Sequence, residues 1–361
     1  MNKLKTYCIF AFQLLILIGA NTTKSFAQSY RSENLFYMVN SLGGYQSFVQ
    51  HADEISIICP QVYQIDSGGV ITGEVDRRVL ELSQKKGIKV MPLFASFDQK
   101  AIHNLLNSES AKKEAIRLML FYARQSHFYG WQFDIENINY GDKDSYTSFF
   151  KQTADSLHKY GFAISSAVVK SEQPAPESAN PPYQHFLYEN WRGAFDIPAI
   201  AAASDFISIM TYDQHTAYTP PGPVAGLPWM KRIVTYLLAS GIPAEKISLG
   251  IPSYSDHWFP TVDGSGPHST RNEISYAAAN DLMDRYEVSS EWMKDQQVYF
   301  THWEAGGIFN WLFIEDAKSF LPKFNLAADN HLRGISVWVI GTEDPQIWNI
   351  LKKEAITVRV K

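Results

Sequence analysis

The chain has 361 residues, a net charge of −5, 45% hydrophobic residues and two cysteines. Its moderate acidity makes nucleic acid and anionic membrane surfaces poor partners, because both attract basic protein faces. Removal of the N-terminal segment described next would leave only Cys59. This excludes an internal disulfide and leaves the hydrophobic core to hold the fold.

Residues 1–27 have the layout of a signal peptide. Lys3 and Lys5 precede an apolar run at 7–20, and the small residues Ser25 and Ala27 fit cleavage after Ala27. The apolar run is short for a membrane span, which needs about 20 residues. We therefore expect a secreted or periplasmic protein of residues 28–361 with no membrane attachment. An uncleaved anchor is the alternative.

Eight short apolar strands follow in chain order. We expect them at 34–40, 54–64, 88–95, 128–137, 162–169, 205–213, 247–255 and 334–341. Helical patterns separate most of these strands, at 75–88, 99–125, 143–160 and 229–240. The segment 171–192 is rich in Pro and polar residues and is expected to be a long loop. The alternation predicts an α/β fold in which parallel βα units close into a (β/α)8 barrel.

The gap at 256–333, between the seventh and eighth strands, is too long for one crossover. It contains short apolar strands near 297–301 and 307–312 and an amphipathic helix near 316–323. We therefore expect a small insertion at about 256–333 within a single barrel domain.

The fourth strand carries three polar groups in register. Alternate side chains of a strand share a face, so Gln132, Asp134 and Glu136 point one way while an apolar set points the other. An edge strand with a solvated polar face is one interpretation. The apolar side, however, calls for a packed layer, and acids at the carboxyl end of a buried strand are typical of barrel enzymes. Two carboxylates about 6.6 Å apart at Cα can share a hydrogen bond, so that one keeps its proton near neutral pH.

Further candidates lie at other strand ends. Tyr212 and Asp213 end the sixth strand, where Met210 shares a face with Tyr212, while Tyr254 ends the seventh strand and Trp338 lies in the eighth. Plain core positions are an alternative for Tyr254 and Trp338. No cluster of residues has the spacing of metal ligands, so we expect neither a metal nor a cofactor.

These motifs together resemble a known family. The stretch YGWQFDIE at 129–136 is similar to the signature of the family-18 glycoside hydrolases, the chitinase-like TIM barrels. MTYD at 210–213 matches the strand-six motif of that family, and Trp338 matches its strand-eight tryptophan. His215 and the segment 222–225 resemble the branch of spore-cortex-lytic N-acetylglucosaminidases and lysosomal chitobiase. The resemblance runs from about residue 34 to residue 350.

The resemblance implies a role for each site residue. Glu136 would be the general acid and later the base, while the 2-acetamido oxygen of the substrate attacks the anomeric carbon. Asp134 would orient the acetamide and Tyr212 would donate a hydrogen bond to it. The remaining predicted substrate-binding residues are Gln132, Met210, Asp213, Tyr254 and Trp338. The chain departs from the chitinase signature at Tyr129 and Gln132, where chitinases have Asp.

The expected function is that of a secreted, retaining hydrolase of β-1,4-linked glycans that contain N-acetylglucosamine. Peptidoglycan is the first candidate substrate and chitin oligomers are the second. Two alternatives stay open: an endo-β-N-acetylglucosaminidase on N-glycans, and a barrel that binds carbohydrate without cutting it. We expect a monomer.

Overall fold

The computed structural model describes residues 30–170, 181–260 and 269–359. The predicted signal peptide at 1–27 lies outside these residues. Among the described helices, none combines the length and the apolar character that crossing a bilayer requires.

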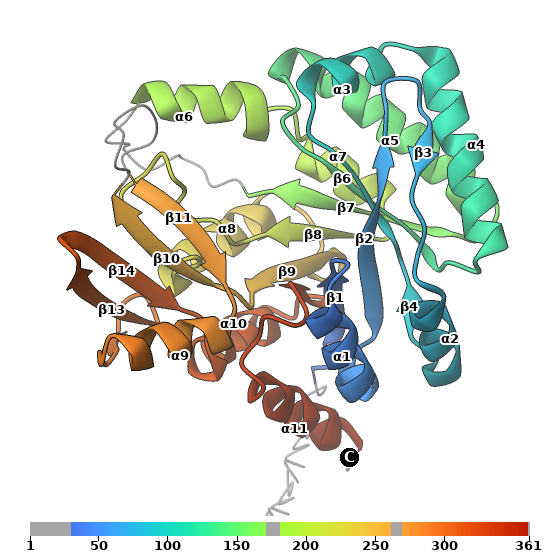
Figure 1. Cartoon of the computed structure of the whole chain (residues 1–361). Coiled ribbons are helices and arrows are strands. Elements are labelled where there is room, and N and C mark those ends of the chain that lie inside the picture. Colours follow the sequence, from blue (N-terminus) through green and yellow to red (C-terminus); the bar gives the residue numbers. More distant parts are fainter. Residues whose placement is uncertain (1–29, 171–180, 261–268, 360–361) are drawn as a thin grey trace, which may run out of the picture.

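Eight parallel strands form a closed barrel (Figure 1), which confirms the predicted fold class. Their bounds are β1 (Glu33–Met38), β2 (Ile57–Ile65), β5 (Leu93–Ser96), β6 (Gly130–Ile135), β7 (Ala163–Val169), β8 (Phe206–Met210), β9 (Ile247–Pro252) and β15 (Gly334–Trp338). The barrel closes because β1 pairs with both β15 and β2. Two short strands pair with the ends of β2: β3 (Ile71–Thr72) with its C-terminal end and β4 (Lys89–Val90) with its N-terminal end.

Helices surround the barrel. They are α1 (Leu42–His51), α2 (Arg77–Lys86), α3 (Gln99–Leu106), α4 (Glu109–Gln125), α5 (Lys143–His158), α7 (Ile197–Ala203), α8 (Leu227–Ala239), α10 (Ala317–Asp329) and α11 (Ile347–Arg359). Several begin at a Ser or Asp whose side chain accepts a backbone N–H of the first turn. Ser108 is such a cap, and it begins α4 directly after α3 ends, so the helical pattern expected at 99–125 forms two helices.

Strand β6 shows how the sequence pattern positions the site. Trp131, Phe133 and Ile135 are fully buried on the helix side, and the Trp131 indole N–H donates to the Met119 carbonyl of α4 at 3.0 Å. This packed outer face fixes the strand in register. Its alternate residues, including Asp134, therefore point into the barrel.

The insertion between β9 and β15 is a five-stranded antiparallel sheet with one helix (Figure 1). Its elements are β10 (Ser255–Pro260), β11 (Ser269–Ile274), α9 (Tyr276–Arg285), β12 (Glu291–Met293), β13 (Val298–Ala305) and β14 (Ile308–Ile314). The sequence analysis extended the insertion to residue 333. That boundary is wrong, because α10 packs against β9, β15 and α8 and so belongs to the helical layer of the barrel.

The expected loop at 171–192 also needs correction. Residues 171–180 lie outside the described residues, but α6 (Pro181–Leu187) and a π-helical turn, η3 (Tyr188–Arg192), follow at once. Two of the four prolines in this segment, Pro181 and Pro182, open the helix. Proline is tolerated there because the first N–H groups of a helix have no intrahelical partner. In Figure 1 the arrowheads of β7 and β8 point toward the space flanked by α6 and the β10–β11 ribbon.

Candidate active site

A cavity of about 710 Å³ opens at the carboxyl ends of the barrel strands. Six of the eight predicted site residues line it: Asp134, Glu136, Met210, Tyr212, Asp213 and Trp338. The segment containing α6 and η3 forms one wall of the cavity, and Glu273 of the insertion lies on another. The cavity is thus built at the end of the barrel where the sequence analysis expected it.

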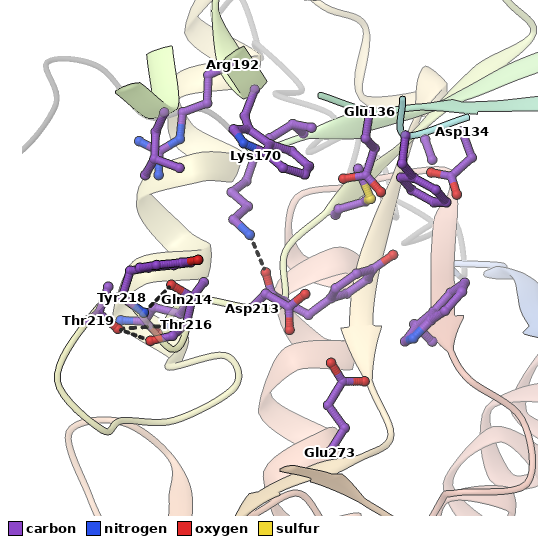
Figure 2. A pocket seen from close by; sticks show the side chains of 18 of the residues that line it. Asp134, Glu136, Lys170, Arg192, Asp213, Gln214, Thr216, Tyr218, Thr219 and Glu273 are labelled. Atoms are coloured by element: carbon purple, nitrogen blue, oxygen red, sulfur yellow. Dashed lines mark hydrogen bonds between the residues drawn. The ribbon is translucent and has the colours of Figure 1, made fainter. Parts of the chain in front are cut away.

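Asp134 and Glu136 lie side by side in this cavity (Figure 2). Asp134 is only 4% exposed, and the Gln61 side chain lies 3.5 Å from its Oδ2. Burial raises the pKa of Asp134 well above its usual range, and the neighbouring charge of Glu136 adds to this rise. The two acids therefore resist being ionised together.

Glu136 is the more accessible of the two acids. Burial raises its pKa to about 7, although the positive charge of Lys170 opposes the rise. The backbone turns directly after Glu136, because Asn137 has a φ of 56°. The Asn137 side-chain N–H donates to the Phe97 carbonyl at 3.1 Å and holds this turn in place. A carboxyl group with this pKa is suited to donate a proton near neutral pH.

Aromatic rings form the floor of the cavity. The rings of Tyr212 and Trp338 stack with 6.4 Å between centroids, and Trp338 also contacts Tyr37 at 5.3 Å. Gly250 of β9 makes room for this arrangement, because a Cβ atom there would lie 3.0 Å from the Tyr212 ring. Flat apolar rings of this kind suit the apolar faces of sugars.

Asp213 is held from several sides. The Tyr254 hydroxyl donates to its Oδ1 at 2.5 Å and Arg271 of β11 donates to the same atom at 2.8 Å. Burial alone would raise the pKa of Asp213, but Lys170, Arg271 and the Tyr254 hydroxyl together hold it below its ordinary value. Asp213 therefore stays ionised at neutral pH.

Two predicted substrate-binding residues lie behind the cavity wall. Gln132 is fully buried in the barrel interior, where its amide N–H₂ donates to Ser165 at 2.7 Å and to Ser208 at 3.0 Å. Tyr254 is 3% exposed and supports Asp213. Neither residue is among those that line the cavity.

Four charged residues near the site were not predicted: Lys170, Arg192, Arg271 and Glu273. Lys170 follows the last residue of β7 and donates to the Tyr212 carbonyl at 2.9 Å. Arg271 pairs with Glu273 and Asp213, and its Nε lies 3.6 Å from Asp256. The strand-end rule could have found Lys170, whereas nothing in the local sequence marks the two insertion residues.

Metal ligation has no support in the described part of the chain, where no group of three His, Cys, Asp or Glu side chains converges.

The model of the glycosyl hydrolases family 18 matches residues 27–343 of the chain. The chain belongs to this family. Family membership makes the protein a glycoside hydrolase, as the sequence analysis predicted.

The sequence of this family-18 hydrolase is similar to two relatives from Bacillus subtilis. It is 23% identical over 325 residues to the uncharacterized glycosylase YvbX of Bacillus subtilis, covering 88% of the chain and 90% of that protein. It is 25% identical over 306 residues to the cortical fragment-lytic enzyme of Bacillus subtilis, covering 82% of the chain and 67% of that enzyme.

Solved structures agree with the fold of the family-18 hydrolase. The spore cortex-lytic enzyme SleL of Bacillus megaterium superposes with a TM-score of 0.79 at 20% identity, over 91% of this chain and 75% of that one. A chitinase of Chromobacterium violaceum superposes with a TM-score of 0.78 at 22% identity, over 90% of this chain and 99% of that one. Both likenesses confirm the barrel.

Proposed function

We propose that this family-18 enzyme hydrolyses β-1,4-linked glycans that contain N-acetylglucosamine, with retention and with help from the acetamide of the substrate. The observation that carries the proposal is the pair Asp134 and Glu136, buried side by side in a cavity floored by Tyr212 and Trp338. One acid of the pair holds a proton that it can give to a leaving group.

Glu136 has the properties required of the proton donor. Its pKa of about 7 keeps it protonated at mildly acidic pH, and it faces the cavity. It would protonate the glycosidic oxygen as the bond breaks and then remove a proton from the attacking water. The same residue serves both steps, as microscopic reversibility requires for retention.

Asp134 and Tyr212 suit the acetamide of the substrate. When the acetamide oxygen attacks the anomeric carbon, positive charge develops on the acetamide, and a carboxylate at Asp134 would stabilise it. The Tyr212 phenol stays protonated, because burial raises its pKa well above 10. It can therefore donate a hydrogen bond to the acetamide oxygen.

The natural substrate proposed first is peptidoglycan. The relatives named cortical fragment-lytic and spore cortex-lytic enzymes support this choice, and the chitinase supports chitin oligomers as the second. The proposal includes export, by the signal peptide at 1–27, to the compartment where cell-wall glycans are found. An endo-β-N-acetylglucosaminidase on N-glycans would use the same residues.

The test is direct. Residues 28–361 are purified and incubated with peptidoglycan, chitin oligosaccharides and an N-glycoprotein, and the products are identified by mass spectrometry, with the anomer first formed read by proton NMR. We expect cleavage next to N-acetylglucosamine with the β-anomer as first product. An α-anomer would refute the mechanism. No cleavage of any of the three would favour a carbohydrate-binding barrel.

We also expect kcat/KM to fall as pH rises through about 7. A general acid works only while protonated, so its contribution is complete below its pKa and is lost above it. The measurement is a pH profile of kcat/KM on a soluble chitin oligomer, with enzyme returned to pH 6 after each exposure to exclude inactivation. An alkaline limb near about 4.3, the ordinary value for Glu, would contradict the assignment of Glu136.

A further inference from the structure

Lys170 has unused hydrogen-bonding capacity in the cavity wall. Its Nζ donates to the Tyr212 carbonyl at 2.9 Å, and the structure gives it no ion pair and no second hydrogen bond among the described residues. A lysine ammonium carries three donors. No described residue accepts a hydrogen bond from the other two, and Lys170 lines the cavity.

Lys170 itself forms no ion pair with any other described residue. Burial lowers the pKa of Lys170, while the charge of Asp213 opposes this, Arg192 adds to it and Glu136 opposes it. Asp213 is already bound by Arg271 at 2.8 Å. Arg192 lines the same cavity, so two cations face it from this side (Figure 2). A buried ammonium that forms no ion pair with a described residue favours an anion beside it.

The position of Lys170 indicates which part of the glycan it meets. Lys170 lies close enough to Glu136 for its charge to lower the pKa of that acid. Glu136 is the proposed proton donor to the glycosidic oxygen, so a group bound by Lys170 belongs to a sugar at the bond being cut. Chitin offers only hydroxyl and acetamide groups there. Glycans with muramic acid offer a carboxylate, either on the lactyl ether or on a peptide attached to it.

We propose that Lys170, with Arg192 beside it, binds a carboxylate of the glycan next to the scissile bond, so that the enzyme selects acidic, muramic-acid-containing glycans over neutral ones. This inference rests on the proposed function and names the substrate class of the same site. A charge-assisted hydrogen bond to Lys170 should favour the acidic glycan by about 10- to 100-fold in kcat/KM.

The experiment compares glycans that differ only in the carboxylate. Peptide-free strands with free lactyl carboxylates are tested beside the same strands with these carboxyls reduced to alcohols, and beside strands that keep their peptides. Wild-type enzyme should prefer the acidic strands over the reduced ones, and Lys170→Met should lose most of that preference. A larger preference for peptide-free strands identifies the lactyl carboxylate as the ligand. A larger preference for peptide-bearing strands identifies the peptide carboxylate.

A matched control is Lys246→Met. Lys246 also donates to backbone carbonyls, those of Ala201 and Ser204, but it lies in η4 (Ala244–Lys246), just before β9 begins and away from the cavity. It should leave the preference unchanged. Lys170→Gln serves as the second variant if Lys170→Met does not fold.

The outcomes separate this inference from the proposed function. Equal turnover of acidic and reduced strands by wild-type enzyme overturns the carboxylate site, as does an equal loss on both strands in Lys170→Met, which would mean that Lys170 acts only through Glu136. If wild-type enzyme cuts neither strand, the Kd values of both strands are measured by calorimetry. Tighter binding of the acidic strand would then keep the carboxylate site and refute the proposed hydrolysis, and equal binding would refute both.

Discussion

Replacing Glu136 by Gln should lower kcat by about 10²- to 10⁴-fold, the contribution typical of a general acid. The amide has nearly the same shape but cannot give a proton to the leaving oxygen. Because no described residue forms a hydrogen bond with the Glu136 side chain, the variant should keep its structure and its affinity for glycan. Turnover of a chitin oligomer and the Kd of the same oligomer measure the two effects separately.

The control for this prediction is Glu114→Gln. Glu114 lies on α4, where it pairs with Arg117 on the protein surface. Its loss should leave kcat unchanged. Full activity of Glu136→Gln would refute the proposed role, and loss of glycan binding together with activity would point to a structural role instead.

The second large effect concerns stability. Lys323→Met should destabilise the protein by about 3–5 kcal/mol, the usual result of removing one partner of a buried ion pair. Lys323 is 0% exposed and Glu315 is 3% exposed, and Glu315 Oε2 accepts from Lys323 and from Ser319. Without the ammonium, a carboxylate would stay buried with only a hydroxyl to compensate it. The midpoint of urea unfolding measures the change.

Two further variants sharpen that experiment. Glu315→Leu combined with Lys323→Met removes both charges, and it should recover most of the lost stability, because apolar pairs of similar volume replace buried ion pairs at little cost. Arg77→Met breaks the exposed pair with Glu81 and should not shift the midpoint measurably. A single Lys323→Met variant as stable as wild type would show that the pair is not needed.

Strand periodicity predicted most of the barrel and much of its cavity. The alternation of polar and apolar residues in β6 placed Asp134 inside the barrel, and the same rule put Met210 and Tyr212 on one face of the sixth strand. The eight apolar segments were enough for the fold class, because parallel strands alternating with helices have few ways to bury both faces.

Periodicity reports which face a residue is on, but not how deep it lies. Gln132 shares its face with Asp134, yet it belongs to a lower layer of the barrel interior, where it binds Ser165 and Ser208. Lys170 was missed because it follows the strand, where the alternation ends. Arg271 reaches Asp213 across 58 residues of sequence, and no local pattern reports such a contact.

The reach of Arg271 limits how this enzyme can be re-engineered. A minimal barrel, made by cutting out the insertion and joining β9 to α10 with a short linker, would delete the guanidinium that neutralises Asp213. It would also remove the acids Asp256 and Glu273 that hold that guanidinium. Any graft of a foreign loop at this position must therefore keep the β10–β11 ribbon, or supply a new cation at the place where Arg271 meets the barrel.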